Sequence, residues 1–79
     1  MYLVYVLKSE NFNKTYVGLT NDIERRMKEH NSGRSTYTKR YAPWMLIHSE
    51  EATSLPDARQ KERWYKGRAG RNYLRKLLS

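Results

Sequence analysis

Residues 2–19 read YLVYVLKSENFNKTYVGL, and this stretch decides the fold class. Residues 2–8 and 14–19 are rich in β-branched and aromatic residues, and residues 10–13, ENFN, separate them. Two such runs predict a β-hairpin. Side chains alternate between the faces of a strand, and both alternating sets of the first run are apolar, so we expect both faces to be covered. The two sets are Leu3, Tyr5 and Leu7 on one face and Tyr2, Val4 and Val6 on the other.

Capping signals after the hairpin indicate a helix and a third strand. Thr20, Asn21 and Asp22 predict the start of a helix over about residues 22–31, and Gly33 marks its end. Residues 34–43 are polar and predict a loop. Residues 44–49, WMLIHS, predict a strand that is entered from a proline.

The last third of the chain predicts two helices. Residues 54–57, SLPD, combine a Ser-x-x-Asp capping pattern with a proline in the first turn, which predicts a helix over residues 55–66. Gly67 and Gly70 are expected to interrupt it. A terminal helix over about residues 71–78 would then close the core with three leucines, Leu74, Leu77 and Leu78.

The element order is therefore β-β-α-β-α-α. This order predicts an α+β fold with a small, antiparallel three-stranded sheet and flanking helices. The chain has 79 residues, fewer than the roughly 100 to 150 that are typical of domains, so we expect a single domain over residues 1–79. A doubly wound cofactor-binding fold is excluded by length.

The basic residues are concentrated at one end of the chain. The net charge is +8, and residues 58–79 contribute eight basic and one acidic residue, or +7. Such a field attracts polyanions, so nucleic acid is the first partner to consider and an anionic membrane surface the second, with a merely solubilising face as the alternative. The sequence has no Cys, which excludes a disulfide scaffold, and no apolar run approaches 18 residues. We expect a cytoplasmic protein without a membrane segment.

Ionisable side chains interrupt the apolar stripes of the two longer helices. Helical spacing from Ile23 places Arg26 and His30 on the first stripe, and spacing from Leu55 places Glu62 on the second. A half-buried charge is costly unless it is paired. Either Arg26 and Glu62 form a structural ion pair, or Arg26 extends to water, or these residues belong to a site.

Two tyrosines of the hairpin bring further chemistry to the same helix face. Tyr5 and Tyr16 lie on adjacent strands and can turn their hydroxyls toward Arg26, while Gly18 leaves room for a backbone or a phosphate to approach. Two phenols, a guanidinium, an imidazole and one carboxylate form a set that can cleave a phosphodiester without a Cys or Ser nucleophile. The alternative is that the tyrosines only pack in the core.

The spacing of these residues resembles that of a known nuclease family. Tyr5 and Tyr16 lie in the tripeptides LVY and YVG and are eleven residues apart. Ten more residues lead to Arg26, four more to His30, and a helix-borne Glu62 follows. This order resembles the GIY-YIG nucleases. The similarity to small stand-alone bacterial members extends over residues 19–33, 35–52 and 58–66.

The resemblance implies roles for the hairpin residues. Tyr5 matches the tyrosine proposed as general base on the attacking water or as its positioner, Tyr16 shares its hydrogen-bond network, and Gly18 is the closing glycine of the motif. A tyrosine with a pKa near 10 is only ~0.1% phenolate at pH 7. A base role for Tyr5 therefore requires a depressed pKa, for which Arg26, a metal or a neighbouring hydroxyl is a candidate cause.

The resemblance also implies roles for three helix residues. Arg26 would bind the scissile phosphate, and Glu62 would be the only carboxylate ligand of a Mg2+ or Mn2+ ion. His30 would relay a proton, contact the phosphate or brace a tyrosine. The family pattern is incomplete at two positions: Leu3 replaces the first glycine, and Asn72 lies too close to Glu62 to match the asparagine near the end of the domain.

These roles imply a metal-dependent endonuclease that hydrolyses phosphodiester bonds in DNA. Without a recognition domain, substrate choice is expected to follow DNA structure or a weak sequence preference, as in DNA repair or recombination. We expect a monomer whose partner is nucleic acid, first of all DNA. The basic side chains expected to contact phosphates are Lys39, Arg40, Arg59, Arg63, Lys66, Arg68 and Arg71.

Two other functions stay open at this point. One is a nucleic-acid-binding protein that keeps the scaffold with little or no cleavage. The other is a structural interaction protein that uses its basic face on a ribosome or a membrane, in which case binding would not depend on Tyr5 or Arg26.

Overall fold

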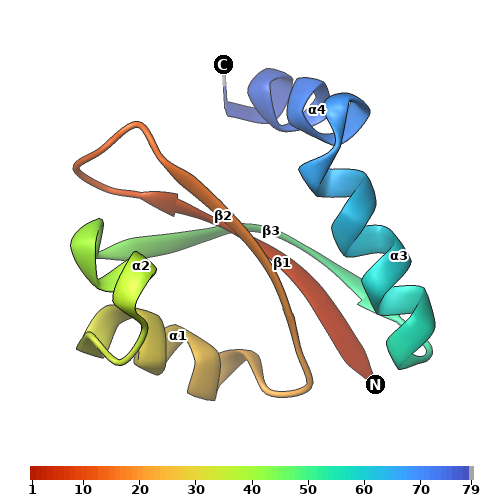
Figure 1. The fold of residues 1–79 in the computed structure, drawn as a ribbon, viewed down its shortest axis with the longest axis horizontal. Helices are drawn as coiled ribbons and strands as arrows, with labels where there is room; N and C mark the ends of the chain where they lie inside the picture. The colour runs from red at the N-terminus through yellow and green to blue at the C-terminus, as the bar shows by residue number, and fades with distance from the viewer. Residues whose placement is uncertain (79) are drawn as a thin grey trace.

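The computed structural model describes residues 1–78 as a three-stranded antiparallel sheet with flanking helices (Figure 1). The elements are β1 (Tyr2–Ser9), β2 (Thr15–Thr20), α1 (Ile23–Ser32), α2 (Thr36–Arg40), β3 (Trp44–Ala52), α3 (Leu55–Lys66) and α4 (Arg68–Leu78). The strand order is β2-β1-β3, so the first strand is central. The predicted fold class is confirmed. The single-domain prediction also includes Ser79, which lies outside the described residues, and it stays a prediction.

The central strand β1 is covered on both faces, as its two apolar sets predicted. Val4 and Val6 pack in a core cluster with residues of α3 and α4. Tyr5 and Leu7 lie in a second cluster with Trp44, against which residues of α1 pack. Figure 1 shows α1 and α2 on one side of the sheet and α3 and α4 on the other. Two small cores therefore share one strand.

Helix α1 is fixed at both ends by its own sequence. Asp22 is the N-cap, and its carboxylate accepts a hydrogen bond from the Arg25 backbone N–H over 3.1 Å. Gly33 ends the helix with a φ of +88°, in the left-handed region that favours glycine. Ile23 and Met27 of this helix pack against the second cluster, and His30 on the same helix is buried while Arg26 is half-buried.

Residues 34–43 contain a short helix, so the prediction of a loop there is wrong. Thr38 of α2 is buried, and its carbonyl accepts a hydrogen bond from Trp44 Nε1 over 2.7 Å. The Thr38 hydroxyl lies 2.9 Å from His30 Nδ1. Helix α2 is thus held by contacts with distant residues, and five residues are too few to show an apolar period.

Helix α3 has the predicted bounds, and its capping pattern is confirmed. The Ser54 hydroxyl accepts a hydrogen bond from the Asp57 backbone N–H over 3.2 Å. Gly67 ends α3 as its C-cap, as predicted. The prediction that Gly70 also belongs to the break is wrong, because α4 begins at Arg68 and Gly70 is buried within it. A Cβ on Gly70 would overlap the backbone of Trp64 and its neighbour, so glycine here permits two helices to approach closely.

The end of α4 contributes less to the core than the sequence predicted. Leu74 is buried, but Leu77 and Leu78 are 44% and 41% exposed, so the prediction that they close the core is wrong. None of the helices within residues 1–78 is both long and apolar enough to cross a membrane.

Candidate active site

Tyr5 is held at the centre of the sheet, directly opposite Gly18 of β2. The Tyr5 side chain is fully buried. A Cβ added to Gly18 would lie 2.6 Å from the Tyr5 hydroxyl oxygen and 2.9 Å from the Tyr16 ring. Two tyrosines therefore fill the space that the sequence suggested for a backbone or a phosphate, and the glycine is needed for their packing.

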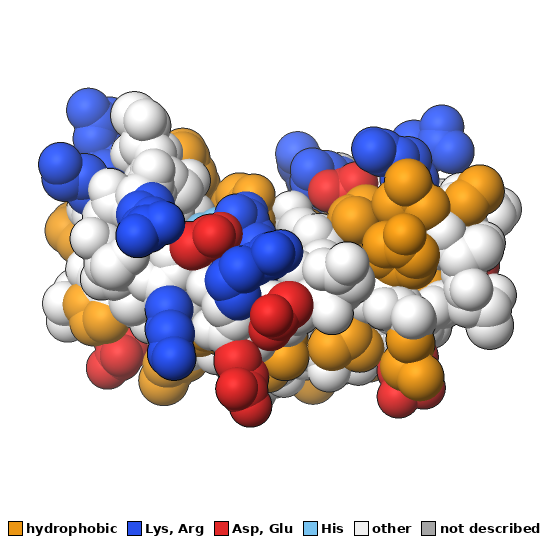
Figure 2. Space-filling view, turned by 90° about the horizontal axis from the view of Figure 1, so that it is seen from below, with side chains coloured by type: hydrophobic (Ala, Val, Ile, Leu, Met, Phe, Trp, Pro, Cys, Tyr) orange, Lys and Arg blue, Asp and Glu red, His pale blue; other side chains and the backbone are white. Residues whose placement is uncertain are grey.

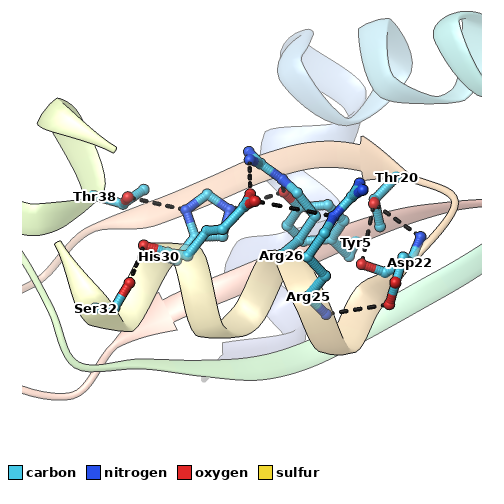
Figure 3. Close-up of polar contacts among 9 residues, drawn as sticks. Tyr5, Thr20, Asp22, Arg25, Arg26, His30, Ser32 and Thr38 are labelled. Atoms are coloured by element: carbon cyan, nitrogen blue, oxygen red, sulfur yellow. Dashed lines mark hydrogen bonds and ion pairs between the residues drawn. The ribbon is translucent and has the colours of Figure 1, made fainter. Parts of the chain in front are cut away.

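A hydrogen-bonded chain links β1, α1 and α2 (Figure 3). The Tyr5 hydroxyl lies 2.9 Å from His30 Nε2, and His30 Nδ1 lies 2.9 Å from the Thr38 hydroxyl. Arg26 Nε donates to the Tyr5 hydroxyl over 3.4 Å. A Tyr5 hydroxyl that accepts from Arg26 can still donate its own proton to Nε2 of a neutral imidazole, and in that tautomer the Nδ1–H donates to Thr38.

Burial decides the protonation states in this chain. It raises the pKa of Tyr5 above the ordinary value of 10.0, although the hydrogen bond and the charge of Arg26 act to lower it. Burial, and after it the Arg26 charge, lowers the pKa of His30. The expected depression of the Tyr5 pKa is therefore absent in the free protein, and both groups are neutral at pH 7.

The lowered pKa of His30 predicts a loss of stability in mild acid. The unfolded chain takes up a proton on His30 near pH 6.5, whereas the folded protein does so only at lower pH. Because the unfolded state binds more protons in this window, the free energy of unfolding should fall as the pH is lowered through about 6.5. Urea midpoints of the wild type and of His30→Gln, measured between pH 7.5 and 5.5, should show a steeper fall for the wild type. Parallel curves would contradict the assignment.

Arg26 contacts a carboxylate as well as Tyr5. Its Nη1 lies 2.6 Å from Glu29 Oε1, and its side chain is 28% exposed, so solution has access to the guanidinium. Glu62 pairs instead with Lys66, at 3.2 Å. One alternative from the sequence was a structural ion pair between Arg26 and Glu62. That alternative is wrong for the described residues, because each of the two side chains pairs within its own helix.

Tyr16 lies beside the hydrogen-bonded chain and also lines a groove. Its ring packs edge-on against the His30 ring, with 4.9 Å between the centroids. A pocket of about 340 Å³ is lined by Tyr16 and Tyr37 from one part of the fold and by Lys66 and Arg71 from the other. Two of the predicted phosphate-contacting cations thus lie in the same groove as the second signature tyrosine.

The other predicted cations are exposed on the surface of the molecule. Figure 2 shows Lys and Arg side chains on both sides of a hollow at the upper edge and others across the middle of the same face, with most of the visible acidic side chains lower down. Helices α2, α3 and α4 carry the predicted set. All seven are exposed: Lys39, Arg40, Arg59, Arg63, Lys66, Arg68 and Arg71.

The arrangement of the signature residues agrees with the comparison with known proteins. The family model of the GIY-YIG catalytic domain matches residues 1–75. The chain belongs to the GIY-YIG family. Within the residues described, three of the predicted GIY-YIG side chains, Tyr5, Arg26 and His30, are joined by hydrogen bonds, and Tyr16 packs against them. The roles of these residues stay predictions.

Relatives of this GIY-YIG domain are small bacterial proteins. UPF0213 protein YazA of Bacillus subtilis is 40% identical over 63 residues, which cover 78% of this chain and 63% of YazA. A UPF0213 protein of Listeria welshimeri is 41% identical over 69 residues, covering 86% of this chain and 76% of that protein. The chain thus spans less than two thirds of the length of YazA.

A solved structure supports the GIY-YIG fold. The solution NMR structure of a UPF0213 protein from Bacillus halodurans matches with a TM-score of 0.56 and 30% identity. The match covers 96% of this chain and 83% of that one.

Two residues of this GIY-YIG site did not emerge from the sequence. Glu29 is the partner of Arg26, and its position three residues later on the same helix is a signal that could have revealed it. Thr38 completes the hydrogen-bonded chain from α2, a segment whose sequence predicted a loop. No local pattern could have identified Thr38, because its role depends on the packing of α2 against α1.

Proposed function

We propose that this GIY-YIG domain is a metal-dependent endonuclease that hydrolyses phosphodiester bonds in DNA, and that it selects sites by DNA structure or by a weak sequence preference. The observation that carries the proposal is the hydrogen-bonded convergence of Arg26, Tyr5 and His30 from two elements of the fold. Cleavage requires an activated water and neutralisation of the charge that builds on the phosphoryl and leaving oxygens. This set supplies groups for both tasks.

Arg26 is the phosphate-binding group in this mechanism. A guanidinium is a permanent cation whose forked donors suit two phosphate oxygens. In the free protein Glu29 provides an anionic oxygen at 2.6 Å from Nη1. A phosphate of the substrate replaces this carboxylate with another anion, and as Arg26 turns to the phosphate it uncovers the Tyr5 hydroxyl.

Tyr5 and His30 together accept the proton of the attacking water. As the water oxygen bonds to phosphorus, its proton passes to the Tyr5 oxygen and the Tyr5 proton passes to His30 Nε2. The bond to the leaving alkoxide breaks, and the alkoxide takes a proton from solvent. This route needs no Tyr5 phenolate in the resting protein, which is consistent with the raised pKa of Tyr5 and with a neutral His30.

Glu62 is the residue that would hold Mg2+ or Mn2+. Its side chain is 20% exposed, and its charge contributes to the raised pKa of Tyr5, so it acts on the site electrostatically. Within residues 1–78 no three His, Cys, Asp or Glu side chains group as a metal site. One carboxylate still fits Mg2+, which keeps several waters and takes substrate phosphates as further ligands. A bound ion would neutralise charge on the phosphoryl and leaving oxygens.

The proposal predicts metal-dependent nicking of branched or interrupted DNA. Purified protein should be incubated with labelled junctions, flaps, nicked duplexes and single strands in Mg2+, Mn2+ or EDTA. We expect nicking with either metal and none in EDTA. The Glu62→Ala protein, prepared in parallel, should bind DNA normally but nick it at least about tenfold more slowly, because even residues that only support a metal ligand contribute about 10- to 100-fold.

The paired preparations also guard against contamination. A contaminating nuclease would be present in both the wild type and Glu62→Ala samples, so equal nicking by the two would contradict the proposal. Nicking that persists in EDTA would exclude the metal-dependent reaction.

One observation favours a second function, DNA binding without cleavage. Tyr5 and His30 are both fully buried in the free protein. If Arg26 never leaves Tyr5, the basic groove can bind nucleic acid while water cannot reach the hydroxyl. This alternative predicts salt-sensitive binding of the same DNA panel by the wild type and no nicking of any member.

A further inference from the structure

A second aromatic cluster lies on the sheet face opposite Tyr5. His48 and Glu50 of β3 pair in register with Val6 and Val4, which face α3 and α4. Above them, Trp64 of α3 and Tyr73 of α4 are 48% and 41% exposed. The cleavage chemistry of Tyr5 and Arg26 gives no reason for these exposed rings.

The exposed rings border a pocket rather than standing alone. The Trp64 and Tyr73 rings have centroids 6.0 Å apart, and each also contacts the buried Tyr65 ring, at 5.0 and 6.3 Å. A pocket of about 400 Å³ is lined by Glu50, Lys61, Trp64, Tyr65 and Tyr73. This volume and its ring-lined walls suit a flat, ring-shaped ligand.

Hydrogen bonds and an ion pair hold the floor of this pocket. The Tyr65 hydroxyl donates to Glu50 Oε1 over 2.7 Å and lies 2.9 Å from His48 Nε2. Lys61 Nζ lies 3.4 Å from Glu50 Oε2. Both carboxylate oxygens of Glu50 therefore have partners, and Lys61 Nζ also lies 3.3 Å from Asp57 Oδ1, so this lysine is shared between two carboxylates.

The surrounding charge selects among the possible occupants. An aromatic cage for a quaternary ammonium requires a favourable field for a cation, but the carboxylate that lines this pocket, Glu50, is already held by Tyr65 and Lys61, and α4 carries four cations and no acidic residue. The same repulsion opposes a second copy of this chain, since its net charge is +8. A base flanked by phosphates satisfies both features, because its ring stacks on aromatic faces while its phosphates meet the cations.

We propose that Trp64 and Tyr73 form a stacking site for an unpaired base of single-stranded nucleic acid. Base stacking on aromatic side chains tolerates any base, because every base has a π-face. The site would give the protein a preference for DNA with unpaired bases, since bases within an intact duplex cannot enter. The inference rests on the nucleic-acid partner of the proposed function but not on cleavage.

Binding of single-stranded oligothymidylate tests the proposal. Fluorescence anisotropy in EDTA, with the duplex of the same length as comparison, separates binding from cleavage. We expect Trp64→Ala and Tyr73→Ala each to weaken single-strand binding by about 5- to 150-fold and to leave duplex binding within about twofold. Phe12→Ala, which removes a ring that is 47% exposed in the hairpin loop, should change neither.

Further measurements keep the test decisive. Trp64→Leu retains apolar bulk, so it should remain folded by circular dichroism and still lose single-strand affinity. Equal weakening of duplex and single-strand binding, or no weakening of either, would overturn the proposal. The oligonucleotide can also be replaced by other occupants in a Trp64 fluorescence assay. Quenching by tetramethylammonium would identify a cation as the occupant, and quenching on raising the protein concentration would identify a second copy of the chain. Failure here would leave the Glu62-dependent nicking assay unaffected.

Discussion

Tyr5→Phe is expected to slow DNA nicking by about 10²- to 10⁴-fold while DNA affinity stays within about twofold. The factor is the usual contribution of a positioned acid–base group. The substitution removes only the hydroxyl, which lies 2.9 Å from His30 Nε2 and accepts from Arg26 Nε. Without it, no group links the attacking water to the imidazole, whereas the cations that bind phosphates remain. Single-turnover nicking in Mg2+ measures the effect.

Stability must be separated from catalysis in this variant. Loss of the Tyr5 hydroxyl leaves buried His30 Nε2 without its hydrogen-bond partner, which costs about 1–3 kcal/mol of folding free energy. Tyr2→Phe is a matched control, because Tyr2 lies on the same strand but packs with the α3 and α4 cluster. It should nick at the wild-type rate. If Tyr5→Phe, folded at the assay temperature, nicked as fast as Tyr2→Phe, the proton route proposed above would be wrong.

The parts of the fold that carry local signals were predictable from sequence. The Ser-x-x-Asp pattern before α3 gave its start, and Gly33 gave the end of α1, because capping depends on a few adjacent residues. The spacing of the tyrosines, Arg26 and His30 indicated the family and brought these residues to one place. Strand alternation likewise predicted that β1 would be covered on both faces.

The features that depend on packing were not predictable in this way. Thr38 reaches His30 only because α2 folds against α1, and nothing in residues 34–43 indicates that helix. The pKa of Tyr5 depends on the balance between burial and the Arg26 charge, and burial outweighs the charge. The sequence indicates which charged residues lie near Tyr5, but it does not show how much water reaches the Tyr5 hydroxyl. The pKa of Tyr5 therefore depends on the burial of its side chain as much as on the charged groups beside it.

Gly70 marks the same limit for the fold, and it leads to the largest expected effect on stability. Glycine in a sequence suggests a helix break, but here it lies inside α4 against the last turn of α3. A Cβ on Gly70 would overlap the Trp64 carbonyl oxygen and would lie 2.6 Å from the Tyr65 carbonyl carbon. These are backbone atoms, so no rotamer change can relieve the overlap.

Overpacking against backbone atoms should cost about 3 kcal/mol, the upper end of the usual range, and the gain in helix propensity returns roughly 1 kcal/mol, so Gly70→Ala should lower the free energy of unfolding by about 2 kcal/mol. For a domain of this size that corresponds to a fall in Tm of about 8–16 °C. Gly67→Ala is the matched control: its Cβ would lie 3.4 Å from the nearest atom, an ordinary contact, and we expect little change. Equal Tm values for the two variants would contradict the close approach of α4 to α3.

Because Arg71 follows Gly70 directly and lines the groove with Tyr16, Gly70→Ala should also weaken DNA binding at temperatures where the protein is still folded, whereas Gly67→Ala should not.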